Sequence, residues 1–160
     1  MKKLLDGIVE FRKNLTQENR ELFATLSLGQ KPDTLFIACS DSRVVPNLFA
    51  STNPGDLFVL RNIGNLIPPA HAPSQDNSAL AVIEFAIFTL KVSDIIICGH
   101  SECGAMTLLT KDEHSSCCPH TASWIQYGKE SLDQLKEGFT LDTTLSFQNQ
   151  LSQINVLQQI

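Results

Sequence analysis

Apolar side chains at helical spacing open the chain. Four of them recur every three or four residues, the spacing of one face of an amphipathic helix: Leu4, Ile8, Phe11 and Leu15. A second amphipathic helix is expected from about Thr16 until a glycine and a proline end it. These helices precede the first predicted strand, so they must cover either a sheet of their own subunit or a partner subunit.

Short apolar runs predict three buried strands, at residues 34–38, 56–60 and 95–98. Between the second and third runs, residues 78–92 are apolar nearly all round a helix. That pattern is typical of a helix buried on more than one side, in a core or at a subunit interface. A strand, a helix and a strand in this order form a right-handed βαβ unit. The predicted fold class is therefore α/β, with a central, mostly parallel β-sheet flanked by helices and with sites beyond the carboxyl ends of its strands.

The remaining patterns complete a single domain. Further helices are expected at residues 46–51, 104–109, 121–135 and 141–160. The loop at residues 61–77 is long enough to be functional. We therefore divide the domain, residues 1–160, into three parts: an N-terminal helical arm (1–30), an α/β core (33–110) and C-terminal helices (121–160).

Composition excludes several classes of protein. With 42% hydrophobic and 18% charged residues, the 160-residue chain is globular rather than disordered. Its net charge of -5 provides no basic surface for nucleic acid. No apolar run approaches the roughly 20 residues of a membrane span. Charged residues interrupt the apolar start that a signal peptide would need, so we expect a cytoplasmic protein. Five cysteines, an odd number, fit reduced thiols and metal ligands better than a disulfide framework.

Cysteine and histidine directly follow two of the predicted strands. Cys39 comes after the first strand, and His100 and Cys103 come after the third. If these strands are neighbours, the three side chains converge, and three ligands with a fourth position open are the arrangement of a catalytic Zn²⁺. Such an ion lowers the pKa of its water to around 7 and supplies a nucleophile. The alternative is a set of buried, inert thiols.

Asp41 and Arg43 lie just past the first ligand. Two residues apart, they are placed for a bidentate pair between guanidinium and carboxylate, which would keep Asp41 ionised and off the metal. An Asx-turn beside a solvated arginine is the alternative. The proton released from water must also reach solvent, and histidines such as His71 or His114 are candidate relays.

Three strings together resemble the β-class carbonic anhydrases, in their plant-type bacterial branch: Cys39-Ser40-Asp41-Ser42-Arg43, Arg61-Asn62-Ile63-Gly64-Asn65 and His100-Ser101-Glu102-Cys103-Gly104-Ala105-Met106. The resemblance covers essentially the whole chain. It implies reversible hydration of CO₂ to bicarbonate and a proton, with one Zn²⁺ per subunit on Cys39, His100 and Cys103. It makes Asp41 and Arg43 the catalytic dyad. It also implies a homodimer or higher homo-oligomer with active sites at the subunit interface, and hence N-terminal helices that pack on a partner subunit.

The same resemblance assigns a substrate pocket. Gln30 matches a glutamine that hydrogen-bonds substrate from the partner subunit, and an ordinary polar residue at a helix end is the alternative. Phe58, Ile63 and Phe85 match an apolar wall near the metal, where core packing alone is the alternative. Gly104 matches a glycine that lets the backbone approach the metal and the substrate closely.

Two features depart from the family pattern. Relatives usually continue well past residue 160 with another strand and helices that cover a sheet edge, so we expect this chain to be a truncated form, a fragment or a naturally shortened form. The string Cys117-Cys118-Pro119-His120 suggests a second metal site, but it lacks further spaced ligands, and a loop is the expected interpretation.

Other functions share parts of the pattern. A zinc-binding structural or sensing homologue would keep the metal and lack catalysis, and a related hydrolase would act on carbonyl sulfide or carbon disulfide. A cysteine-dependent phosphatase needs five residues between its cysteine and its arginine, whereas three separate Cys39 from Arg43. A nucleotide-binding domain lacks its glycine-rich fingerprint after the first strand. Phe36 stands where bicarbonate-regulated members carry tryptophan, so we expect an open zinc site rather than one closed by Asp41.

Overall fold

The computed structural model describes residues 1–69, 77–111 and 117–160. The chain divides into two compact units, Met1–Lys31 and Pro32–Ile160, which are treated separately below. Within the described ranges, no helix has both the length and the apolar character needed to cross a bilayer.

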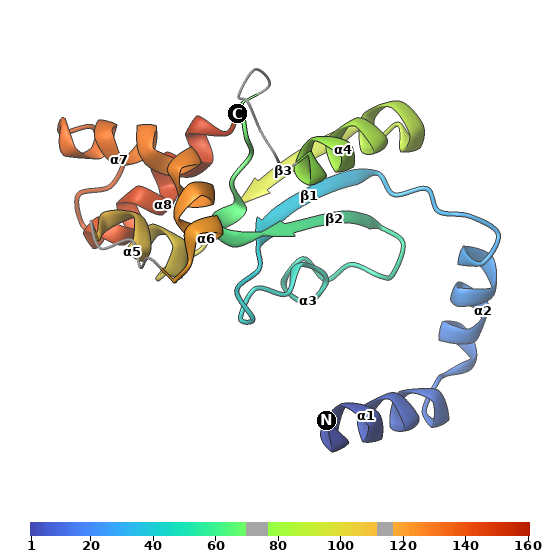
Figure 1. Ribbon diagram of the computed structural model, residues 1–160. Helices are drawn as coiled ribbons and strands as arrows, with labels where there is room; N and C mark the ends of the chain where they lie inside the picture. Colours follow the sequence, from blue (N-terminus) through green and yellow to red (C-terminus); the bar gives the residue numbers. More distant parts are fainter. Residues whose placement is uncertain (70–76, 112–116) are drawn as a thin grey trace. The chain divides into compact units, whose positions relative to one another are not determined.

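The N-terminal unit consists of two helices, α1 (Lys2–Lys13) and α2 (Gln17–Leu26), as the apolar spacing predicts (Figure 1). Thr16 caps α2, because its hydroxyl oxygen accepts a backbone N–H of the first turn at 3.2 Å. The rings of Phe11 and Phe23 pack edge to face, with centroids 6.2 Å apart. Neither helix buries a residue, so the apolar face of α1 remains exposed in this chain.

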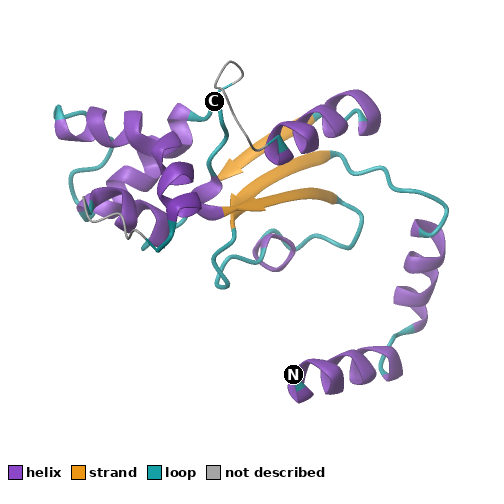
Figure 2. Cartoon of the chain, viewed as in Figure 1, coloured by secondary structure: helices purple, strands orange, loops and turns teal. Residues whose placement is uncertain are grey.

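The second unit is built on a parallel sheet with the strand order β2-β1-β3 (Figures 1 and 2). The strands are β1 (Thr34–Cys39), β2 (Leu57–Asn62) and β3 (Asp94–Cys98). The buried strand β1 lies in the middle of the sheet. Its Ala38 pairs with Arg61 of β2 on one side and with Cys98 of β3 on the other. Since all three strands run the same way, their carboxyl ends meet at one edge. The predicted parallel α/β fold is confirmed.

Helices connect the strands. The short α3 (Pro46–Phe49) joins β1 to β2, and α4 (Ser78–Glu84) continues as a π-helical segment, η2 (Phe85–Leu90), before β3. Ala86 of this helix is fully buried, whereas Phe88 is 75% exposed. Within this chain the helix is therefore buried on one side only. Of the two settings predicted for it, a core and a subunit interface, the subunit interface is the one that would cover its exposed side.

β3 is not the buried strand that its apolar sequence predicts. Ile95 and Ile96 are about half exposed, because β3 forms an edge of the described sheet and only β1 pairs with it there. An edge strand presents unpaired backbone groups as well as side chains.

Helical segments follow the sheet and pack against one another: α5 (Gly104–Thr110), α6 (Pro119–Ile125), η3 (Gln126–Gly128), α7 (Lys129–Lys136) and α8 (Phe147–Gln158). Together with Leu66 and Cys39 they form one apolar cluster, whose members from the helices include Leu109, Ile125, Leu132, Leu151 and Ile154. This cluster places the helices beyond the carboxyl ends of the strands, beside the predicted site (Figure 1).

The helix predicted at residues 121–135 is broken. The chain turns at η3, where a Cβ on Gly128 would lie 3.0 Å from Cδ2 of Leu109. Periodicity across this stretch gave no indication of the break, because the close approach involves a side chain from another helix.

The last predicted helix, at residues 141–160, begins later than expected. The carboxylate of Asp142 accepts the backbone N–H of Thr144 at 2.9 Å, which forms a turn, and Ser146 then caps α8. Short polar side chains compete in this way with helical hydrogen bonds. The buried apolar face of this helix is also shorter than predicted, because Leu157 is half exposed and Ile160 is exposed.

Candidate metal centre

The three predicted ligands meet at the carboxyl edge of the sheet. Cys39 ends β1, His100 lies in the turn after β3, and Cys103 directly precedes α5. The Sγ atoms of Cys39 and Cys103 are 4.0 Å apart. The ligand atoms of all three residues lie within 4.8 Å of one another, and no other such group of three occurs in the described part of the chain.

This set of side chains fits Zn²⁺. Cys39 and Cys103 are buried, with 4% and 1% of their surface exposed. Nε2 of His100 is also buried and has no hydrogen-bond partner among the described residues. A buried polar atom without a partner is unfavourable, and a bound cation would satisfy it. Two sulfurs and one imidazole nitrogen are ligands that zinc prefers, and they leave a fourth tetrahedral position open.

Burial raises the pKa of the Cys103 thiol. The backbone N–H of Met106 opposes this shift, and the nearby sulfur of Cys39 adds to it. A low-dielectric setting disfavours the thiolate until a cation compensates its charge. Metal binding at this site therefore releases a proton.

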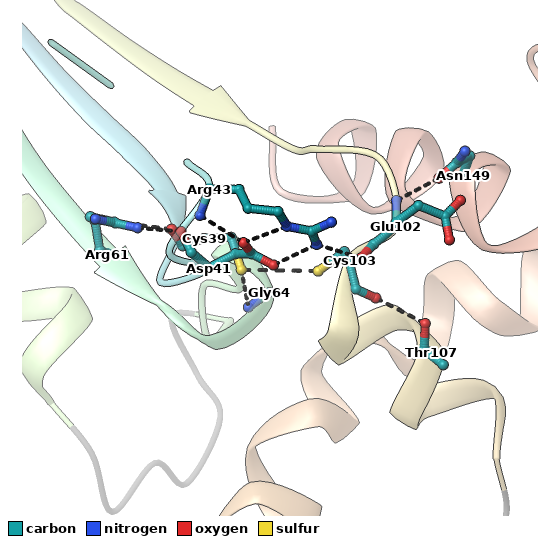
Figure 3. A network of polar contacts seen from close by, with 9 residues as sticks. All are labelled: Cys39, Asp41, Arg43, Arg61, Gly64, Glu102, Cys103, Thr107 and Asn149. Atoms are coloured by element: carbon teal, nitrogen blue, oxygen red, sulfur yellow. Dashed lines mark hydrogen bonds and ion pairs between the residues drawn. The ribbon is translucent and has the colours of Figure 1, made fainter. Parts of the chain in front are cut away.

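Backbone groups hold the ligands in place (Figure 3). The N–H of Gly64 donates to Sγ of Cys39 at 3.4 Å. Glu102 adopts a left-handed conformation, with φ of 52°, and its N–H donates to Oδ1 of Asn149 at 2.8 Å. The turn between His100 and Cys103 is thus fixed by a side chain from α8.

Asp41 and Arg43 form the predicted bidentate pair. Nε and Nη2 of Arg43 donate to Oδ1 and Oδ2 of Asp41 at 2.9 and 2.8 Å, and the Arg43 backbone N–H also donates to Oδ1 at 2.9 Å. The Asx-turn and the ion pair are therefore present together. Nη2 also donates to the carbonyl oxygen of Glu102 at 3.1 Å, which connects the two ligand motifs (Figure 3). These hydrogen bonds hold the pKa of Asp41 well below its ordinary value.

Arg61 is a site residue whose role the sequence did not reveal. Its Nε donates to the carbonyl oxygen of Cys39 at 3.0 Å, and its Nη2 donates to that of Asp41 at 2.7 Å (Figure 3). The side chain reaches them because Arg61 pairs with Ala38 across the sheet. The relative register of β1 and β2 would have been needed to predict this contact.

Distant helices brace the loop after β2. Gly64 has φ of 78°, and a Cβ there would lie 2.8 Å from Cβ of Ala105, so only glycine fits. Nδ2 of Asn155 in α8 donates to the Gly64 carbonyl oxygen at 3.2 Å. Nε1 of Trp124 in α6 donates to the carbonyl oxygen of Ile63 at 2.8 Å. These contacts hold the backbone that donates to Cys39.

The five predicted pocket residues lie in different places. The rings of Phe58 in β2 and Phe85 in η2 pack in a tilted arrangement with centroids 5.8 Å apart, and Ile63 is half exposed in the loop after β2. Gly104 begins α5, where a Cβ would meet no protein atom within 4 Å. Gln30 is exposed in the N-terminal unit. The candidate proton relays at positions 71 and 114 lie outside the described residues.

Two hollows reach His100. One, of about 370 Å³, has Arg43, Val44 and Phe49 in its lining. The other, of about 430 Å³, lies against α8 and is lined by residues that include Val156. The first combines the guanidinium group of Arg43 with apolar walls, but its described lining includes neither Asp41 nor the five predicted pocket residues.

Comparisons with known proteins agree on one family. The family model described as carbonic anhydrase matches residues 34–160. A carbonic anhydrase of Helicobacter pylori strain J99 is 44% identical over 133 residues, which cover 81% of this chain and 60% of the relative. A carbonic anhydrase of Synechocystis is 40% identical over 165 residues, covering 99% of this chain and 60% of the relative. The chain thus spans about 60% of the length of these curated relatives.

Solved structures are similar over nearly the whole chain. The β-carbonic anhydrase CcaA superposes with a TM-score of 0.88 at 37% identity, covering 99% of this chain and 71% of that one. One of two tetrameric β-carbonic anhydrases from Sordaria macrospora superposes with a TM-score of 0.82 at 30% identity, covering 99% and 77%.

Proposed function

The chain belongs to the β-class carbonic anhydrase family, and from this premise we propose that the protein catalyses the zinc-dependent, reversible hydration of CO₂ to bicarbonate and a proton. One observation carries the proposal. The ligand atoms of Cys39, His100 and Cys103 lie within 4.8 Å of one another, directly beside the ion pair of Asp41 and Arg43.

Sγ of Cys39, Nε2 of His100 and Sγ of Cys103 would hold one Zn²⁺ per subunit. Bound there, zinc supplies a Lewis acid that makes water ionise near neutral pH. The fourth position stays open because the carboxylate of Asp41 is engaged by Arg43. This engagement supports the open resting site that Phe36 suggested.

Asp41 acts as an acceptor that orients the reacting water. Its pKa is held far below neutrality, so it does not take up the proton itself. Oδ1 already accepts two hydrogen bonds from Arg43, whereas Oδ2 accepts one, so Oδ2 keeps a lone pair that can accept a hydrogen bond from the reacting water. Arg43 fixes that carboxylate, and its own position is fixed by the carbonyl oxygen of Glu102. The pair therefore positions the nucleophile and favours the anionic product.

The substrate contacts proposed for Gln30, Phe58, Ile63, Phe85 and Gly104 rest on the family resemblance. The cytoplasmic location expected from the sequence is likewise part of the proposal. We propose a homodimer or larger homo-oligomer. Support comes from the exposed apolar surface on α1 and η2, and from the tetrameric relatives in Sordaria macrospora.

The test combines metal analysis with stopped-flow CO₂ hydration. Wild-type protein should contain one zinc per chain and be active, whereas Cys39→Ser and His100→Ala should lose both zinc and activity. Asp41→Asn should retain zinc and lose about 10²-fold or more in kcat/KM. Cys118→Ser and His120→Ala are matched controls outside the ligand group, and both should behave as wild type.

Each contrary result has a distinct meaning. Full activity in zinc-free protein would refute the proposal. Stoichiometric zinc without CO₂ hydration would indicate the structural or sensing alternative. Parallel assays with carbonyl sulfide and carbon disulfide would detect the related hydrolases.

A further inference from the structure

Two adjacent thiols lie outside the zinc ligand group. The Sγ atoms of Cys117 and Cys118 are 3.5 Å apart, and both residues are exposed. Their hydrogen bond raises the pKa of the Cys118 thiol. The described part of the chain brings no third metal-binding side chain to this pair. The described residues therefore supply too few ligands here for a four-coordinate zinc site.

Backbone contacts fix Cys118 at the start of α6. Cys118 is the cap residue of α6, and its carbonyl oxygen accepts the N–H of Ala122 at 3.0 Å. Pro119 is the first residue of the helix, and a proline disfavours the helical conformation for the residue before it. Cys118 has φ of -130° and ψ of 59°. These contacts fix the backbone at Cys118, and the Sγ atom of the neighbouring Cys117 lies 3.5 Å from the Sγ atom of Cys118.

We propose that Cys117 and Cys118 form a chelating site for trivalent arsenicals, separate from the zinc site. Thiolate sulfur is a soft ligand that selects soft electrophiles. Exposure of both sulfurs gives such a reagent access. Arsenic(III) forms pyramidal compounds with neighbouring sulfurs and needs only two of them when it carries one organic group. The site requires no residue beyond this pair.

The reaction balances without an oxidant. An organoarsenic oxide, R–As=O, meets two thiols, both S–H bonds break, and two As–S bonds form. The oxygen leaves as water with the two protons, and arsenic remains trivalent. Once the first As–S bond exists, the second forms within one molecule, at a high effective concentration. Two adjacent thiols should therefore bind far more tightly than either alone.

The test uses phenylarsine oxide on zinc-loaded protein. Zinc loading is required because Cys39 and Cys103, 4.0 Å apart, form a second pair of sulfurs in the metal-free protein. Intact mass spectrometry should show one phenylarsenic group per chain and the loss of two hydrogens. Thiol titration should fall by two while the zinc content remains unchanged. A small dithiol should remove the adduct, and a monothiol at equal thiol concentration should not.

Variants decide which sulfurs bind. Cys117→Ser and Cys118→Ser should each weaken binding by about 10²-fold or more, since only one As–S bond remains. Cys98→Ser, which removes a partly buried single thiol, should bind as wild type. Retained zinc shows that each variant is folded. Equal affinity in Cys118→Ser, or an adduct that expels zinc from the metal centre, would overturn the proposal.

Discussion

At the scale of single residues, Arg43 decides the charge of Asp41. Its guanidinium and its backbone N–H all donate to that carboxylate. The pKa of Asp41 therefore lies well below its ordinary value of 3.8. Because the folded pKa lies below the unfolded one, the pair stabilises the fold above about pH 4. This contribution is lost as pH falls through the folded pKa.

Arg43→Gln should raise the pKa of Asp41 towards 3.8, because the largest cause of its depression is removed. Carbon-detected NMR of the Asp41 carboxyl carbon measures this directly, over the pH range in which each protein stays folded. Wild type should show no titration of Asp41 near pH 3.8, and the variant should titrate closer to this value than wild type, because the backbone N–H of residue 43 still donates to the carboxylate.

Lys129→Gln is the matched control, since it breaks the exposed ion pair with Asp133 and leaves Asp41 untouched. Titration of Asp41 near its ordinary pKa in the wild type would contradict the role assigned to Arg43.

The sequence was sufficient to predict the candidate ligands and the dyad. Cys39 and His100 follow strands, and parallel strands bring their carboxyl ends together, so their convergence could be predicted. Asp41 and Arg43 lie so close to Cys39 that their pairing is local. Asn155 could not be found in this way, because it is 91 residues from Gly64 and their contact depends on how α8 packs.

At the scale of elements, α8 braces the loop that contacts Cys39, a predicted zinc ligand. Asn155 is 1% exposed, and its Nδ2 donates to the Gly64 carbonyl oxygen. Gln159 donates to Oδ1 of Asn155 at 3.3 Å and accepts the N–H of Ile67 at 2.7 Å. Gly64 in turn donates to Cys39. A helix late in the sequence thus reaches the metal centre through two hydrogen bonds in series.

Asn155→Ala should lower the free energy of unfolding by about 1–3 kcal/mol, because it leaves the buried Gly64 carbonyl oxygen without this donor. It should also weaken zinc binding, since the loop that donates to Cys39 loosens. Urea denaturation and competition with a chelator measure the two effects.

Gln153→Ala, on an exposed position of the same helix, is the control and should change stability by no more than about 0.5 kcal/mol. Zinc affinity unchanged in Asn155→Ala would show that the brace affects stability alone.

The succession of the strands and of most helices along the chain followed from apolar periodicity, but tertiary packing decided the helix boundaries. The break lies at Gly128, which packs closely against Leu109 of another helix. The exposure of β3 depends on its place at the sheet edge. An apolar sequence indicates that a surface is buried in the functional protein. It does not show whether the same chain or a partner subunit buries it.

At the scale of the whole molecule, apolar side chains remain exposed in both units. Ile8 of α1 is 56% exposed, and Phe88 of η2 is 75% exposed. Single exposed apolar residues are ordinary, but the face of α1 presents several of them at regular spacing: Leu4, Ile8 and Phe11. An unpartnered amphipathic helix gains little stability from its own sequence, so a covering partner is needed to hold its apolar face.

If the proposed homodimer covers that face, a charge placed in its centre must weaken association, because the carboxylate would be buried without a partner. Ile8→Glu should raise the dimer dissociation constant by about tenfold or more. Analytical ultracentrifugation of the zinc-loaded protein over a range of concentrations measures this. Lys2→Glu changes charge on the opposite face of α1 and should leave the dissociation constant unchanged. Equal association of both variants would exclude α1 from the interface, and the apolar surface of η2 and β3 would then be the remaining candidate for the contact.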